Sequence, residues 1–170
     1  MHPFVLACFQ VEVAYQCRAA LTAYSALKQA AADCQLAGSD LPTTLAARDR
    51  IWFAVDALLN AAANISKLLW SKGGASAKRR KPLRDSLNVS DSSVLRDREL
   101  RNHFEHFDHR LETYLQAGPT PLGIRNVGSL QALQLSHTDM FQHYDPVSGE
   151  IAFGDHVVLA RHIAMKLWPS

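Results

Sequence analysis

The apolar residues of the first part of the chain recur at helical spacing without a break. From Val13 to Cys34 they alternate in steps of four and three residues, and Gly38 stands just beyond the last of them. This spacing places the apolar side chains on one face of an α-helix, and glycine is common just after a helix C-terminus. The sequence therefore predicts one long amphipathic helix over residues 4–37. Such a helix is stable only when other parts of the chain cover its apolar face.

The next segment repeats this pattern. Apolar residues from Trp52 to Leu69 again form one stripe, and Thr43 or Thr44 is the expected N-cap of a helix that ends near residue 71. Two long helices joined by a short polar turn predict an antiparallel hairpin that packs against further helices. The composition agrees, because 24 Ala and 22 Leu stand against 10 Val and 5 Ile, and Ala and Leu favour helix over sheet. We therefore expect neither a β-sandwich nor a parallel α/β sheet.

Two further elements are expected after a polar segment. Apolar residues at helical spacing predict a third helix over residues 91–116. Residues 140–144 and 150–153 flank a turn with Pro early and Gly late, which predicts a β-hairpin. Asp155 is the expected cap of a last helix that reaches about residue 168.

These elements predict a mainly α protein of a single domain. The 170 residues are enough for one hydrophobic core. Residues 1–117 are expected to form an antiparallel helical bundle. Residues 118–170 are expected to form a small C-terminal extension, made of the β-hairpin and the terminal helix, that packs on the bundle.

The cysteines and the N-terminus favour a soluble, cytoplasmic protein. The apolar start at residues 3–9 has no basic segment before it and is soon followed by Glu12, so we interpret it as the start of a helix and not as a signal peptide. No uninterrupted apolar stretch reaches the roughly 20 residues of a membrane span. An odd, sparse set of cysteines without a C-x-x-C pair argues against a disulfide framework. The three are Cys8, Cys17 and Cys34.

A basic segment stands between the second and third predicted helices. Residues 67–84 hold seven Lys and Arg and no Asp or Glu, although the net charge of the whole chain is only +2. Three interpretations stay open: a solvated loop, a nuclear localisation signal, and a patch that contacts the phosphates of a nucleic acid. The candidate residues for contacts with an RNA backbone are Lys72, Lys78, Arg79, Arg80, Lys81 and Arg84.

The third predicted helix concentrates residues that can carry chemistry. Seven of the eight histidines follow residue 102, and three of them fall within residues 103–109. If Leu100 faces the core, the rotation of about 100° per residue places a set of polar residues on the parts of the helix surface that face away from the core. Asn102 and His106, one helical turn apart, then share a side. The polar set comprises Arg98, Arg101, Asn102, Glu105, His106 and His109.

The stretch from Arg101 to His106 reads Arg-Asn-His-Phe-Glu-His. It resembles the signature of HEPN-domain ribonucleases, in which Arg and a polar residue are followed by three variable residues and His. The resemblance covers the motif and the helices of residues 4–117. It implies a HEPN-like bundle with the motif on a late helix, a metal-independent endoribonuclease, and a role as a toxin or defence protein. It also implies RNA as substrate, a homodimer through the motif helix, and an antitoxin protein as a further partner.

The residue types suit RNA cleavage without a metal or another cofactor. Histidine ionises near neutral pH, so His106 can act as general acid or base toward the 2′-hydroxyl. The planar guanidinium of Arg101 can bind two oxygens of the phosphate in the transition state. Asn102 would orient the histidine or the phosphate. The possible supporting residues are Glu105, Arg98 and His109.

Three other interpretations of the motif stay open. His103, His106 and His109 could bind a metal, but they rotate steadily around the predicted helix and no H-E-x-x-H pair is present, so we expect no metal. The helix could belong to a non-catalytic HEPN-like module that binds RNA, a nucleotide or a protein. It could also be a solvated helix with ordinary ion pairs, such as Arg101 with Glu105.

Overall fold

The structure is a computed structural model. It describes residues 1–38, 40–71, 74–96, 106–117, 124–136, 139–154 and 156–165.

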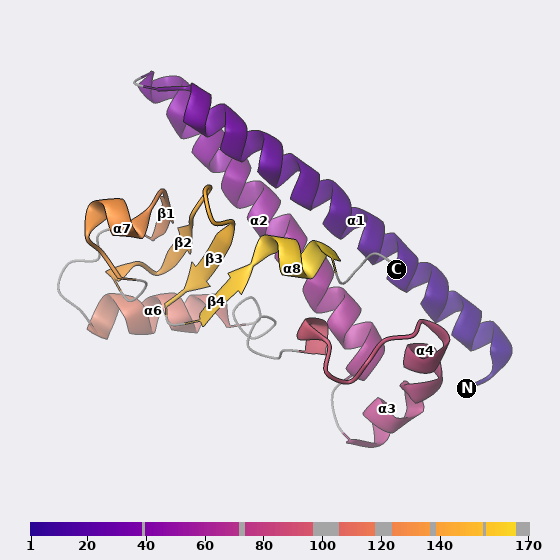
Figure 1. Ribbon diagram of the computed structural model, residues 1–170. Coiled ribbons are helices and arrows are strands. Elements are labelled where there is room, and N and C mark those ends of the chain that lie inside the picture. Colours follow the sequence, from indigo (N-terminus) through magenta and orange to yellow (C-terminus); the bar gives the residue numbers. More distant parts are fainter. Residues whose placement is uncertain are drawn as a thin grey trace.

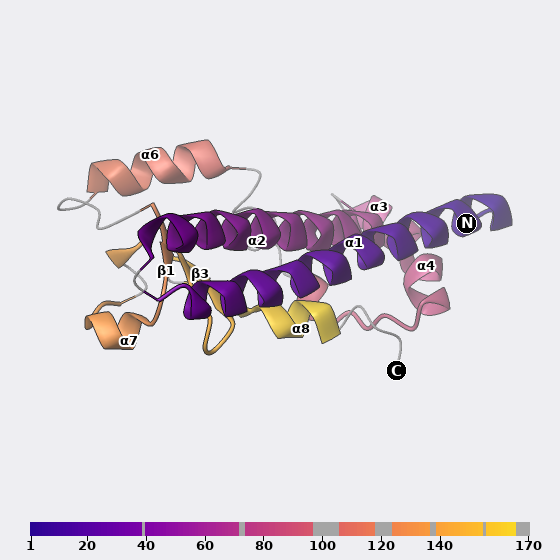
Figure 2. The ribbon, with the colours of Figure 1, turned by 90° about the horizontal axis from the view of Figure 1, so that it is seen from above.

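Two long helices form the backbone of the molecule. Helices α1 (Pro3–Leu36) and α2 (Leu41–Trp70) lie side by side as an antiparallel hairpin (Figures 1 and 2). Both helices and the turn between them were predicted from the apolar spacing, and the structure confirms them. Gly38 has φ +55°, the left-handed conformation that lets the chain leave α1.

The N-terminus of α2 lies slightly earlier than predicted. Asp40 is the N-cap residue, and Thr43 and Thr44 already belong to the helix. The hydroxyl of Thr43 donates to the Asp40 carboxylate, and that of Thr44 donates to the Asp40 carbonyl oxygen at 2.9 Å. The predicted threonine cap is therefore wrong by about one turn. Pro42 does not prevent this, because proline is tolerated in the first helical turn.

The described part of the basic segment beyond α2 is folded into short helices and is not a loop. It forms α3 (Gly74–Arg79) and α4 (Lys81–Ser86), followed by the 3-10 turn η1 (Val94–Arg96). Helices α3 and α4 lie near the end of the hairpin where the N-terminus of α1 is found (Figures 1 and 2). The predicted third helix does not begin at residue 91, because residues 91–93 form a turn before η1. Its C-terminal part is α6 (Phe107–Ala117).

A small sheet follows α6 in the chain. Its strands are β1 (Arg125–Val127), β2 (Gln142–Tyr144), β3 (Glu150–Phe153) and β4 (His156–Leu159), in that spatial order. The β2–β3 pair is the predicted hairpin and is antiparallel. Strand β1 pairs parallel to β2, and the short helix α7 (Leu130–Leu133) lies between them in the chain.

The last helix begins later than predicted. Residues 156–159 form β4, and α8 (Ala160–Met165) begins only after it. The β-branched Val157 and Val158 suit an extended strand better than a helix, and they lie opposite Ala152 and Ile151 of β3. The prediction of a helix from residue 155 onward is therefore wrong for its first turn.

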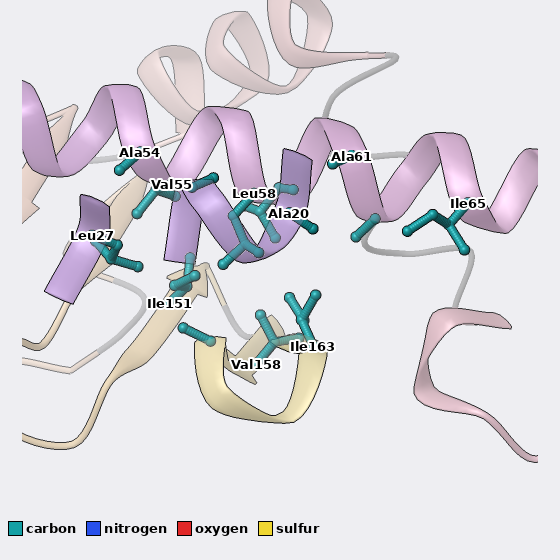
Figure 3. Packing of buried hydrophobic residues seen from close by; sticks show 14 of the residues in the cluster. Ala20, Leu27, Ala54, Val55, Leu58, Ala61, Ile65, Ile151, Val158 and Ile163 are labelled. Carbon is teal, nitrogen blue, oxygen red and sulfur yellow. The ribbon is translucent and has the colours of Figure 1, made fainter. Parts of the chain in front are cut away.

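The core lies where the sheet and α8 meet the α1–α2 hairpin (Figure 3). Ile151 of β3, Val158 of β4 and Ile163 of α8 are directed toward side chains of the two long helices, among them Leu27 and Leu58. The chain is thus mostly helical with a small sheet near the C-terminal end, as expected. Among the described residues, the sheet and α8 cover the hairpin where the sequence predicts further helices, and a helical bundle stays a prediction.

One property of α1 bears on localisation. It contains an 18-residue window with a mean hydropathy of 1.2, long and apolar enough to cross a membrane. Core helices of soluble proteins and N-terminal signal sequences share this property. The cytoplasmic location stays a prediction from the sequence.

Candidate functional site

Helix α6 is held against the sheet by its aromatic face. The rings of Phe107 and Tyr114 pack on Phe141, with centroid separations of 5.5 and 5.3 Å. The hydroxyl of Tyr114 donates to the carbonyl oxygen of Asp139 at 2.9 Å. Leu111, on the same side of the helix, is half-buried. These contacts orient α6 and decide which of its residues face solvent.

His106 and His109 are the described members of the predicted catalytic set. His106 directly precedes α6, and its carbonyl oxygen accepts a hydrogen bond from the Arg110 amide at 3.0 Å, which closes the first turn. Both histidine side chains are exposed, and their spacing of three residues places them on neighbouring positions of the helix surface. The two imidazoles are therefore accessible to a ligand that approaches the start of α6.

The other members of this set lie outside the described residues. They are Arg98, Arg101, Asn102 and Glu105, and the same holds for Lys72 of the basic segment. Their roles stay predictions from the motif.

Arg84 has a structural role, contrary to its predicted contact with an RNA backbone. Its side chain is buried, and its Nη1 donates to the carbonyl oxygens of Leu69 at 2.8 Å and Ala77 at 3.1 Å. Its Nε lies 3.1 Å from Oδ1 of Asp91, which also accepts a hydrogen bond from Trp70 Nε1 at 2.9 Å. This guanidinium joins the end of α2 to the basic segment, so we remove Arg84 from the candidate phosphate ligands.

Two further cations of the basic segment are engaged within the fold. The guanidinium of Arg80 lies 3.8 Å from the ring centroid of Phe9, and burial lowers the pKa of Arg80. The ammonium group of Lys81 is 2.7 Å from the Asp85 carboxylate, in an exposed ion pair.

Lys78 and Arg79 are the exposed cations best placed to meet a ligand from solvent. Arg79 donates to Ser76 Oγ at 2.9 Å and keeps further donors free for solvent. Both residues belong to α3, whereas the exposed histidines belong to α6. Figures 1 and 2 show α3 and α6 apart from each other. The described basic residues therefore do not line a common cleft with His106 within one copy of the chain.

A polar network between α2 and the sheet was not anticipated from the sequence. Arg125 of β1 donates from Nη2 to Asp56 at 3.0 Å and from Nε to Gln142 at 3.1 Å, and its guanidinium lies 5.6 Å from the ring centroid of Trp52. Burial raises the pKa of the Asp56 carboxyl, and the attraction of Arg125 opposes this rise. The network fastens β1 and β2 to α2. Asp56 and Arg125 are 69 positions apart, and no local pattern links them.

No metal centre is formed by the residues that the structure describes, since no three of their His, Cys, Asp and Glu side chains come together in a suitable group. His103 and Glu105 lie outside those residues. The expected absence of a metal therefore stays a prediction.

Comparison with protein-family models, with curated proteins and with solved structures finds no match to this chain. The resemblance of residues 101–106 to the HEPN signature therefore enters the function as a proposal.

Proposed function

We propose that the chain is a metal-independent endoribonuclease of HEPN type that acts as a toxin or defence protein. The observation that supports it is the exposure of His106 and His109 at the start of α6, four and seven residues after Asn102 of the motif. Among the described residues, neither imidazole has a contact that would explain its presence by stability alone. Two accessible histidines beside an arginine are the residue types that RNA cleavage without a metal requires.

The proposed reaction needs two proton transfers and one phosphoryl transfer. A general base removes the proton of the ribose 2′-hydroxyl, and the 2′-oxygen attacks the adjacent phosphorus. The bond from phosphorus to the 5′-oxygen breaks, and a general acid gives that oxygen a proton. The products are a 2′,3′-cyclic phosphate and a 5′-hydroxyl. His106 serves as acid or base, His109 supports it, and Arg101 binds the phosphate as charge builds up on its oxygens.

The two exposed cations of α3 contribute to binding and not to chemistry in this proposal. Lys78 and Arg79 would attract the phosphates of an RNA long enough to reach from α6 to α3. An antitoxin protein and a cytoplasmic location belong to the same proposal.

The test is cleavage of mixed RNA by the purified chain in the presence of EDTA. The parent should produce fragments that end in a 2′,3′-cyclic phosphate. Arg101→Ala and His106→Ala should each lower the rate by about 10²-fold or more, because each removes a group that acts in the transition state. His162→Ala is a matched control, since His162 is an exposed histidine on α8 and should be dispensable. Circular dichroism checks that all variants fold.

Two results would contradict the proposal. One is full activity of the His106→Ala variant, and the other is cleavage by the parent that EDTA abolishes. Binding of RNA by the parent without any cleavage would identify the non-catalytic module instead.

A further inference from the structure

A groove runs between α1 and α2, and no described element covers it. Its volume is about 790 Å³, and alanines such as Ala23, Ala30 and Ala54 form its floor. Large apolar side chains stand at its rim, with Tyr15 exposed to 59% and Phe53 to 70%. The residues that line the groove belong to α1 and α2 alone, and in Figure 1 no described element lies on the side of α1 opposite the sheet and α8. Small residues on the floor let the backbone of another helix approach closely.

Two pairs of the residues that α1 places along this groove are symmetric about the midpoint between Ser25 and Ala26. Arg18 and Asp33 are equally distant from that midpoint, and so are Thr22 and Gln29. Tyr15, at the rim, has as its mirror position Leu36, which is exposed on α1 beyond the residues that line the groove. When a helix packs antiparallel on a copy of itself, each residue lies opposite its mirror position. Arg18 would then lie opposite Asp33 of the other copy, and Thr22 opposite Gln29.

The charges select this antiparallel arrangement. Asp33 lies 3.2 Å from Arg50 of α2 and accepts a hydrogen bond from Gln29 at 2.8 Å, so its carboxylate is held at the groove wall. Arg18 is exposed on the same wall, and it has no ion-pair partner among the described residues. An antiparallel copy would place each Arg18 opposite the other Asp33. A parallel copy would place Arg18 opposite Arg18 and repel it.

We propose that the groove receives α1 of a second copy, so that two α1–α2 hairpins form a symmetric antiparallel dimer. The matched residues 15–36 extend over about 32 Å at 1.5 Å per residue, long enough for an interface of ordinary size. The charged and amide side chains that line the groove suit a protein partner and are costly inside a lipid bilayer.

This surface differs from the motif-helix dimer that the HEPN resemblance implies. No residue of α6 lines the groove, so His106 and His109 are expected to stay exposed in the proposed dimer. The proposal therefore stands or falls independently of the proposed RNA cleavage.

The test measures the mass of the full chain by sedimentation equilibrium. The parent should be a dimer. Arg18→Asp and Asp33→Lys should each raise the dissociation constant by about tenfold or more, because each places two like-charged pairs across the interface. An equimolar mixture of the two variants should recover the dimer, since the mixed pair restores both attractions. Lys28→Asp is the matched control, because Lys28 is exposed on α1 outside the groove and its variant should stay dimeric.

Four results would overturn the proposal. They are a monomeric parent, a mixture of the two variants that stays monomeric, an Arg18→Asp variant as dimeric as the parent, and a dimer that His109→Glu alone dissociates. Binding of the parent to phosphatidylcholine–phosphatidylserine vesicles in place of self-association would also overturn it and assign the face to lipid. Unchanged RNA cleavage by the Arg18→Asp variant would leave the proposed function standing whichever result is found.

Discussion

The guanidinium of Arg84 is surrounded by acceptors from three parts of the chain, namely the end of α2, α3 and the turn at Asp91. Arg80, four residues earlier in the chain, lies with its guanidinium over the ring of Phe9. Both arginines come from one basic segment, yet each is used inside the fold. At the scale of single residues, charge in the sequence identified where cations gather but not which of them face solvent.

This structural role predicts that a substitution of Arg84 lowers the free energy of unfolding much more than a substitution of the nearby Lys81. Arg84→Met should lower the free energy of unfolding by about 2–4 kcal/mol, because buried carbonyl oxygens lose their donor and Asp91 loses its ion pair. Lys81→Met should change it by less than about 0.5 kcal/mol, since the Lys81–Asp85 pair is exposed. Urea denaturation followed by circular dichroism measures both. Equal effects of the two substitutions would contradict the structural role of Arg84.

At the scale of elements, predictions from neighbouring residues were correct where only one pattern was present in a segment. The apolar spacing identified α1 and α2, and Gly38 identified the turn between them. The predictions were wrong where residues that favour different structures follow one another closely. Asp155 is a good helix cap, but the valines that follow it prefer a strand and pair with β3, so α8 begins later.

The turn between the long helices provides a prediction at this scale. Gly38→Ala should lower the free energy of unfolding by about 1–2 kcal/mol, because a Cβ is strained at φ +55°. Apart from the adjacent residues, no described atom lies within 4 Å of the added methyl group, so the change in stability reports the backbone conformation and not the packing. Gly38→Asn should lower the free energy of unfolding by less than Gly38→Ala, since asparagine tolerates the left-handed region better than alanine. Thermal or urea unfolding of the two variants tests the order, and an alanine variant as stable as the parent would contradict it.

At the scale of the whole molecule, the contact between sheet and hairpin decides the architecture. Tyr144 of β2 is 4% exposed and belongs to the same cluster as the buried residues of α1 and α2. Burial raises the pKa of its phenol to about 12, and Tyr24 and Asp145 add to the rise. The neutral phenol of Tyr144 therefore contributes to the packing of the sheet on the two long helices.

This contact predicts a loss of stability in alkaline solution. The ordinary pKa of the phenol is 10.0, so the contribution of neutral Tyr144 is complete below pH 10 and is lost as the pH rises toward 12. Tyr144→Phe should make the unfolding free energy depend less steeply on pH in this range. Urea midpoints across the range measure the slopes, and identical slopes for parent and Tyr144→Phe would contradict the prediction.

Some features of the candidate site are likewise evident from the sequence, and others only from the structure. The Arg-Asn-x-x-x-His motif is a property of neighbouring residues, and the sequence alone was enough to single it out. The structure adds that His106 and His109 are exposed, because Phe107 and Tyr114 turn the other side of α6 onto Phe141. It also separates α3 from α6, which no spacing could indicate.

The sequence by itself determined the two long helices, their turn and the β2–β3 hairpin, since each depends on residues close together in the chain. Only the tertiary structure decided that a sheet and α8 cover the hairpin, that Arg125 joins Asp56, and that no described element covers the Ala-lined groove. The physical reason is the range of the interactions. Helical periodicity and turn conformation act over a few residues, whereas burial and ion pairing depend on which distant segments meet.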